Sequence, residues 1–152
     1  MRDARLNCLF DLVQPGERVA DIGSDHAFLS IALVSAGRTV RVIATDIRKG
    51  PLETAARHIE KAGLTGAIEL RQGDGLSVIH SVEVDAVIIA GLGGETIAAI
   101  LAAAPWAAEK RLLLQPMTHA DRLYAFLRAA HIPVREEHVV DKRRYLVLRA
   151  GN

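Results

Sequence analysis

The stretch Val19-Ala20-Asp21-Ile22-Gly23-Ser24-Asp25-His26-Ala27 decides the expected fold. It begins as a short apolar strand that contains an acid, turns at Gly23, and leads into the polar start of an apolar helix. A second apolar run, from Val40 to Thr45, closes on Asp46. A strand, a glycine turn, a helix and a second strand that ends in an acid together hold a nucleoside cofactor in doubly wound sheets.

The acids beside this turn indicate which nucleoside cofactor it would hold. A dinucleotide fingerprint needs three glycines so that the backbone can approach a pyrophosphate, but here only Gly23 is present, with Asp25 close behind it. A carboxylate facing a phosphate at 4 Å would cost roughly 4 kcal/mol at an effective dielectric constant near 20. S-adenosyl-L-methionine has no phosphate and carries a sulfonium and an ammonium group. Asp21 and Asp25 therefore favour this cofactor over NAD.

Length and composition fit a single domain, 1–152, with half of its residues hydrophobic but only 4% aromatic. No apolar run reaches the roughly 18 residues of a membrane span, and the first residues lack the apolar core of a signal peptide. The single cysteine, Cys8, excludes an internal disulfide and predicts a cytoplasmic protein, with Cys8 as a packing residue. The net charge of +1 means that nucleic-acid binding would need a local basic patch.

Strand and helix signals alternate along the chain. Strands are expected at about 18–22, 40–45, 67–71, 84–90 and 111–115, and helices at about 4–13, 25–36, 51–62, 94–104 and 119–130. Two final strands, 134–140 and 144–149, are separated by a link too short for a crossover helix, so the last strand should be antiparallel. The pattern predicts an α/β, Rossmann-like class I methyltransferase fold: a seven-stranded, mostly parallel sheet ordered 3-2-1-4-5-7-6 with helices on both faces.

The candidate site residues follow the ends of the parallel strands, where open α/β sheets bind their ligands. Each of these segments holds glycine, an acid, or an amide beside proline: Gly23 to His26, Asp46-Ile47, Gly73-Asp74-Gly75, Gly91 to Gly94, and Gln115-Pro116-Met117. Asp74 could accept from an adenine amine, although an Asx turn would also explain it. The glycines from 91 to 94 could leave room for a flat base, or could allow close packing of a helix on the sheet.

Four motifs carry a more specific resemblance. They are Ala20 to Ala27, Arg71-Gln72-Gly73-Asp74-Gly75-Leu76, Ile89-Ala90-Gly91-Leu92-Gly93-Gly94 and Leu113-Leu114-Gln115-Pro116. With these motifs in this order, the chain resembles the bacterial tRNA (adenine(22)-N1)-methyltransferase family from roughly residue 5 to 150. The resemblance implies a class I fold, S-adenosyl-L-methionine as cofactor, and methylation of N1 of an adenine in the D-arm region of tRNA.

The strand ends and the resemblance together give two sets of candidate residues. The expected cofactor-binding residues are Asp21, Gly23, Ser24, Asp25, Asp46, Ile47, Gly73, Asp74, Gly75, Ala90 and Gly91. The expected catalytic residues are Asp25, His26, Gly91, Gln115 and Pro116. By the resemblance, Asp46 would lie at the ribose and Asp74 at the adenine of the cofactor. No metal site is expected, because the other histidines lack metal-ligand spacing.

Two features depart from the family. The family usually has Asn after Gln-Pro, whereas this chain has Met117, so a polar substrate contact would be missing or supplied by Thr118 or His119. The family also has a C-terminal helical extension thought to help grip tRNA, whereas this sequence ends at Asn152. A shorter natural variant, a truncated form, or a different partner or substrate would each account for this difference.

Methyl transfer to adenine N1 demands few protein groups. The nitrogen lone pair attacks the methyl carbon in line with the departing sulfur, so positioning supplies much of the rate acceleration. Asp25 could stabilise the positive charge that grows on the exocyclic amine or accept its proton, although it could instead only cap the following helix. His26 could orient the loop.

Candidate contacts to tRNA phosphates are the basic residues Arg2, Arg5, Arg48, Lys49 and Lys142-Arg143-Arg144, unless these form an ordinary solvated surface. Trp106 and Tyr124 could stack on bases, although Trp106 also fits a packing role. Two other functions stay open: a class I methyltransferase that acts on a small molecule or a protein, and a non-catalytic S-adenosyl-L-methionine-binding module that works with a partner.

Overall fold

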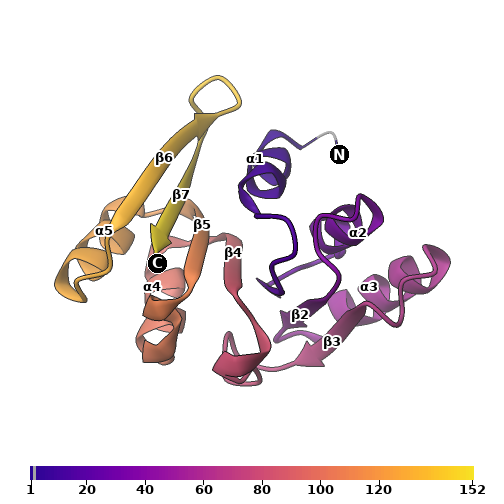
Figure 1. The fold of residues 1–152 in the computed structure, drawn as a ribbon. Helices are drawn as coiled ribbons and strands as arrows, with labels where there is room; N and C mark the ends of the chain where they lie inside the picture. The colour runs from indigo at the N-terminus through magenta and orange to yellow at the C-terminus, as the bar shows by residue number, and fades with distance from the viewer. Residues whose placement is uncertain (2) are drawn as a thin grey trace.

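A seven-stranded sheet forms the centre of the molecule, with helices on both of its faces (Figure 1). This computed structural model describes Met1 and residues 3–152. The strands are β1 (Val19–Ile22), β2 (Val42–Asp46), β3 (Ile68–Gln72), β4 (Ala86–Gly93), β5 (Arg111–Thr118), β6 (Val134–Val140) and β7 (Tyr145–Gly151). The helices are α1 (Ala4–Leu12), α2 (Phe28–Ser35), α3 (Lys49–Lys61), α4 (Gly94–Ala102) and α5 (Ala120–Ala129), with short 3-10 helices η1 (Ser81–Glu83) and η2 (Pro105–Glu109).

The strand order confirms the predicted topology. It is β3-β2-β1-β4-β5-β7-β6, in which β1 to β5 are parallel and β7 is antiparallel to both of its neighbours. The direction in which successive strands are added reverses between β1 and β4, which leaves a crevice at their carboxyl ends. The predicted Rossmann-like α/β fold is therefore confirmed.

Alternate side chains of the central strands feed two hydrophobic layers. In β4, Val87 and Ile89 belong to the layer that includes Ile97 of α4, while Ile88 belongs to the layer that includes Leu33 of α2. Helices α4 and α5 cover the first face, and α1, α2 and α3 cover the second. Because β4 is buried on both faces, its sequence is a nearly continuous apolar run. No helix in the described part of the chain is long and apolar enough to span a membrane.

Strands β4 and β5 are longer than the sequence predicts. The sequence indicates that the fifth strand stops at Pro116, but β5 continues to Thr118 and β4 continues to Gly93. The ladder between them changes register around Leu92, which pairs with Pro116. At such an irregularity the missing N–H of proline removes no regular ladder bond, so the strand can pass through it.

Close approach explains Gly94 at the start of α4. A Cβ on Gly94 would overlap the main-chain oxygen of His119, just before α5. Gly94 therefore allows close packing of α4, which is one of the two explanations offered for the glycines from 91 to 94. Gly66 lies in the turn before β3, and no atom of the described part of the chain lies within 4 Å of a Cβ built on it.

We predict that Gly94→Ala lowers the free energy of unfolding by about 2 kcal/mol, because overpacking that displaces backbone is destabilising. Gly66→Ala is the matched control and should change it by less than about 0.5 kcal/mol. Urea unfolding followed by circular dichroism measures both. Equal stability of the two variants would contradict the packing role of Gly94.

Candidate functional site

A cavity of about 470 Å³ lies at the carboxyl ends of β1 and β4, where the strand order reverses. It is enclosed by the turn after β1, the end of β4, the start of α1, and Arg48 after β2. The predicted site residues that line it are Asp21, Gly23, Ser24, Asp25, His26, Ala90 and Gly91. The fold thus brings together the candidates that follow the first and fourth strands.

Asp21 is a buried acid in the wall of this cavity, with 5% of its surface exposed. The hydroxyl of Ser30 in α2 donates to its carboxylate at 2.7 Å. Burial raises the pKa of Asp21 to about 6, and the bond from Ser30 offsets this rise only in part. Because its hydrogen-bond partner is neutral, the ionised carboxylate has charge left to pair with a cationic ligand group.

The turn after β1 is tied to the end of β2. The N–H groups of Gly23 and Ser24 both donate to the carbonyl of Thr45, at 2.9 and 3.1 Å. Gly23 needs its glycine because its φ is +68°. The buried hydroxyl oxygens of Ser24 and Thr45 have no hydrogen-bond partner among the described residues. Buried polar groups are rarely left unpaired, so a ligand that bonds to Ser24 would complete this turn.

The loop that follows has strained backbone. Asp25 and Ala27 adopt left-handed conformations, with φ of +54° and +61°. For this reason α2 begins at Phe28 rather than near residue 25, and Ala27 is its N-cap residue. The interpretation of Asp25 as a helix cap is therefore wrong. Its carboxylate is exposed at the cavity and lies 3.8 Å from the Nε2 atom of His26.

Asp46 lies at the same edge of the sheet, at the end of β2, and is buried. Its Oδ1 atom accepts from the main-chain N–H of Arg48 at 2.9 Å and from the guanidinium Nε of the same residue at 3.4 Å. Both contacts use Oδ1, so Oδ2 is available to a ligand within the described structure. Ile47 is 62% exposed beside it. Neither Asp46 nor Ile47 lines the cavity. The lining residue is Arg48, whose main-chain N–H is bonded to Asp46.

Gln115 is fully buried, and its amide is already engaged. Its Oε1 atom accepts from the N–H of Gly91 and from Nη1 of Arg5, each at 3.0 Å, while its Nε2 atom donates to the carbonyl of Pro116 at 3.1 Å. The structure therefore places Gln115 and Pro116 behind the cavity wall. In this segment the side chain that lines the cavity is Met117, whereas Thr118 and His119 do not line it.

The segment Gly73-Asp74-Gly75 lies outside this cavity. Asp74 instead lines a smaller one of about 200 Å³, beside α4. A Cβ on Gly73 would overlap Val78, and a Cβ on Gly75 would approach Ile100 of α4 to 2.9 Å. Close packing therefore accounts for these two glycines, and the adenine contact of Asp74 stays a prediction.

Arg5 is a site residue that sequence reasoning assigns only to phosphate binding. It projects from α1 into the cavity wall, where its Nη2 atom pairs with Asp3 at 2.9 Å. Its guanidinium also lies over the ring of Tyr145, 5.4 Å from the centroid, and the guanidinium of Arg144 lies 5.6 Å from the same centroid. No local pattern could predict this position, because it depends on how α1 packs across the ends of β4 and β5.

The other sequence candidates lie elsewhere. Lys49 pairs with Glu53 at 3.9 Å on α3. Trp106 and Tyr124 pack against the hydrophobic layer beneath α4 and α5, which makes them packing residues rather than a surface for bases. Arg2 lies outside the described residues. Within Met1 and residues 3–152, no group of three or more His, Cys, Asp or Glu side chains could hold a metal ion.

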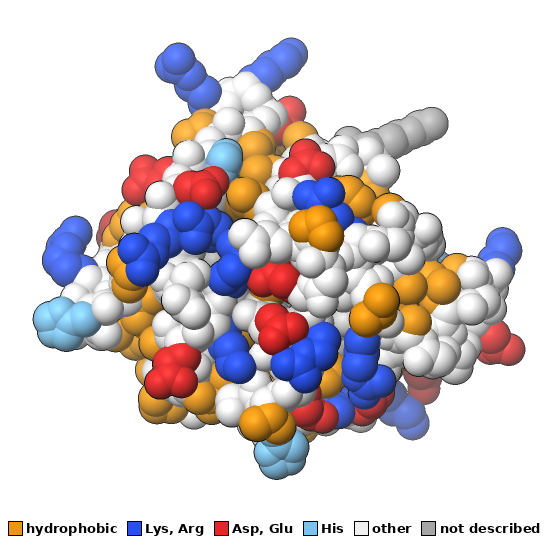
Figure 2. Space-filling view, viewed as in Figure 1, with side chains coloured by type: hydrophobic (Ala, Val, Ile, Leu, Met, Phe, Trp, Pro, Cys, Tyr) orange, Lys and Arg blue, Asp and Glu red, His pale blue; other side chains and the backbone are white. Residues whose placement is uncertain are grey.

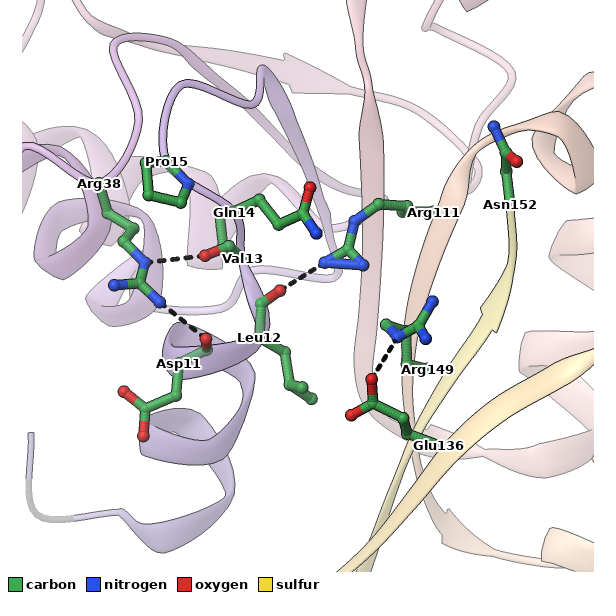
Figure 3. A pocket seen from close by; sticks show the side chains of 10 residues that line it. All are labelled: Asp11, Leu12, Val13, Gln14, Pro15, Arg38, Arg111, Glu136, Arg149 and Asn152. Atoms are coloured by element: carbon green, nitrogen blue, oxygen red, sulfur yellow. Dashed lines mark hydrogen bonds and ion pairs between the residues drawn. The ribbon is translucent and has the colours of Figure 1, made fainter.

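A second cavity, of about 510 Å³, lies at the opposite end of the parallel strands, near the start of β5 and the end of β7 (Figure 3). Arg38 donates to two main-chain carbonyls at the end of α1, at 2.8 and 2.7 Å, and Arg111 donates to a third at 2.5 Å. Arg149 pairs with Glu136 at 2.9 Å. Arg38 and Arg111 satisfy a helix C-terminus, so this cavity has a structural explanation.

Comparison with known proteins agrees with this geometry. Residues 2–148 match the model of the methyltransferase domain family. The tRNA (adenine(22)-N(1))-methyltransferase of Bacillus subtilis is 39% identical over 140 residues, which cover 91% of this chain but only 59% of that protein. The chain thus spans less than two thirds of the length of this curated relative.

Solved structures give the same result. The crystal structure of the B. subtilis m1A22 tRNA methyltransferase has a TM-score of 0.92 and 38% identity, covering 99% of this chain and 66% of that one. The structure of the M. capricolum enzyme TrmK in complex with S-adenosyl-homocysteine has a TM-score of 0.87 and 31% identity, covering 99% and 68%. The chain therefore belongs to the methyltransferase domain family, in the group of the bacterial tRNA (adenine(22)-N1)-methyltransferases.

Proposed function

We propose that this protein transfers a methyl group from S-adenosyl-L-methionine to N1 of an adenine in tRNA. The observation that carries the proposal is the cavity at the ends of β1 and β4, where the buried Asp21 and the exposed Asp25 face one space. The B. subtilis relative, whose name specifies this reaction, supports the substrate and the acceptor atom.

The residues of the cavity fit this cofactor. Asp21 and Asp25 can pair with its ammonium and sulfonium groups, and the unpartnered hydroxyl of Ser24 can bond to its polar atoms. No described residue bonds to Oδ2 of Asp46, so this atom can accept from ribose hydroxyls, as the acid at the end of the second strand does in this kind of fold. A dinucleotide would instead bring phosphates against these acids, at a cost of several kcal/mol.

When bound, the cofactor supplies an electrophilic methyl group on a sulfonium centre. The protein then has to hold the acceptor base, exclude water and accommodate charge. Gly91 leaves the end of β4 open to a flat base, because among the described residues only Arg5 comes within 4 Å of a Cβ built on it. Leu92 and Met117 supply apolar wall around that opening. Transfer to N1 makes the base cationic, and Asp25 can stabilise that charge or accept the exocyclic proton.

Basic groups lead from the cavity to the hairpin of β6 and β7. Arg5 and Arg144 flank Tyr145, and Lys142 and Arg143 occupy the tip of the hairpin, which projects beyond α1 in Figure 1. Residues 141–143 all have left-handed backbone, with φ of +50°, +55° and +69°. Figure 2 shows Lys and Arg side chains extending from the top of the molecule, where that tip lies. This surface supports binding of RNA phosphates next to the cavity.

The central experiment is methylation of tRNA by the full chain. We expect mass spectrometry of nucleosides from tRNA, after incubation with protein and labelled S-adenosyl-L-methionine, to show labelled N1-methyladenosine. Free adenosine and a mixture of proteins are offered as alternative methyl acceptors, and a reaction with heat-treated enzyme is the negative control. Transfer to protein or to the nucleoside alone would replace tRNA as substrate. Binding of S-adenosyl-L-methionine with no transfer to any acceptor would indicate a non-catalytic module.

Asp46→Ala tests the ribose contact. We expect it to weaken binding of S-adenosyl-homocysteine by about 1–3 kcal/mol, or roughly fivefold to 150-fold in Kd, because a charged hydrogen bond is lost. Asp46→Asn keeps an oxygen for Arg48 and should lose less. The exposed Glu60→Gln on α3 is the control. Isothermal titration calorimetry measures all three, and an unchanged Kd for Asp46→Ala would remove Asp46 from the site.

Asp21→Asn tests whether the buried carboxylate of Asp21, which has no cationic partner among the described residues, destabilises the fold. A pKa raised from 3.8 to about 6 means that the folded protein holds this proton when the unfolded chain has released it. The contribution of Asp21 to stability therefore falls as pH rises from about 4 to 6, by roughly 3 kcal/mol in total. At pH 7.5 we expect the variant to be more stable than the wild type by up to that amount, with the difference shrinking towards pH 4.

Urea unfolding across this pH range, with Glu60→Gln as control, measures the difference between the two proteins. The variant should also bind S-adenosyl-homocysteine more weakly, because the carboxylate that pairs with its ammonium group is gone. A stability difference that does not change between pH 4 and 7.5 would show that Asp21 carries no such penalty.

A further inference from the structure

Three rings form a cluster at the rim of the cavity, in which His26 and Phe28 are exposed and His58 is half-buried. The ring of Phe28 at the start of α2 stacks on His58 of α3, with centroids 5.4 Å apart and an interplanar angle of 14°. The imidazole of His26 stacks on the same phenyl ring at 5.3 Å and 29°. His26 and Phe28 both line the cavity, so a group that covers these rings would lie next to the proposed cofactor.

The backbone holds these rings outward. Ala27 is fully buried, whereas His26 on one side of it and Phe28 on the other are exposed, and Phe28 has 52% of its surface exposed. This arrangement requires left-handed backbone at Asp25 and Ala27, which costs of order 1–3 kcal/mol for each residue. Strained backbone persists only where neighbouring groups hold it in place. One such group is His58, whose Nδ1 atom lies 3.1 Å from the carbonyl oxygen of His26.

The proposed reaction creates a need for such a surface. N1 of adenine lies on the base-pairing edge, so the target base must be unpaired and must leave its stack before N1 can reach a methyl donor. The base next to it in the RNA then loses a stacking partner. Proteins that bind single-stranded RNA replace that partner with aromatic or imidazole rings.

We propose that His26, Phe28 and His58 form a stacking platform for an unpaired RNA base that neighbours the methylated adenine. The inference rests on the proposed function and names a part of the site that holds the substrate. Phe28 supplies the exposed face, and His58 positions the loop that carries it. Arg48 also lines the cavity, with 67% of its side chain exposed, and provides a cation for the phosphate of the stacked nucleotide.

The first test compares Phe28→Ala, Phe28→Tyr and the control Val40→Ala, which truncates an apolar side chain that is 73% exposed before β2. Binding of tRNA is measured by fluorescence anisotropy with saturating S-adenosyl-homocysteine, and binding of S-adenosyl-homocysteine is measured separately. We expect Phe28→Ala to weaken tRNA binding by about tenfold, while Phe28→Tyr and Val40→Ala stay within about twofold of the wild type. All three should keep the wild-type Kd for S-adenosyl-homocysteine.

Unchanged tRNA binding by Phe28→Ala would overturn the platform. A loss of S-adenosyl-homocysteine binding by that variant would also overturn it and assign the rings to the cofactor instead. An equal loss in Phe28→Tyr would mean that the position matters for something other than stacking. In each case methyl transfer by the wild-type protein is recorded in parallel, so a failure of the platform is distinguishable from a failure of the proposed activity.

The second test detects stacking without turnover. The chain has one tryptophan, so Phe28→Trp in a Trp106→Phe background gives a single fluorophore in the platform. We expect its emission to be quenched by a single-stranded RNA of about 12 nucleotides and much less by the matching duplex. No quenching by the single strand would overturn the proposal, and so would equal quenching by both RNAs, since simple charge attraction does not distinguish stacked from unstacked bases.

Discussion

The shared acceptor at Thr45 is the constraint on which the site depends. Two consecutive N–H groups, those of Gly23 and Ser24, donate to this one carbonyl and hold the turn after β1 against the end of β2. This contact fixes Asp21 on one side of the turn and the strained loop on the other, and keeps Asp46 within the same edge of the sheet. The contact extends the parallel pairing of β1 and β2 beyond Ile22, so the turn that carries Ser24 and Asp25 stays next to the end of β2 and Asp46.

Several groups at the site lower the stability of the folded protein. An acid inside a hydrophobic sheet loses hydration, and one hydroxyl from Ser30 replaces only part of it, which is why the pKa of Asp21 rises to about 6. The unpaired hydroxyl of Ser24 and the left-handed backbone at Asp25 and Ala27 add to this cost. These features gather at one cavity, as expected where binding rather than stability selects the residues.

The fold could be predicted from sequence because its signals are local. Apolar runs, glycine turns and the short hairpin link each specify an element. The parallel direction of the first five strands follows from the alternation of strands and helices. Residues that directly follow β1 and β4 could be placed for the same reason. The start of α2 could not, because left-handed backbone at Asp25 and Ala27 has no clear sequence signal. The position of Arg5 and the buried amide of Gln115 depend on how α1 crosses the sheet, which no pattern within one segment records.

Met117, where the resemblance led us to expect a polar residue, is in contact with Arg5 of α1. The Sδ atom of Met117 lies 3.3 Å from Nη1 of Arg5 and 3.4 Å from Nε2 of Gln115, so the thioether belongs to the same cluster that fixes the end of β5. Arg5 is in turn held by Asp3. At this wall of the cavity the first helix therefore contributes the polar group, Arg5, and the end of β5 contributes the thioether of Met117. Because one helix carries that group, small shifts of α1 would alter the wall that faces the acceptor base while the cofactor side, built on β1 and β2, stayed in place.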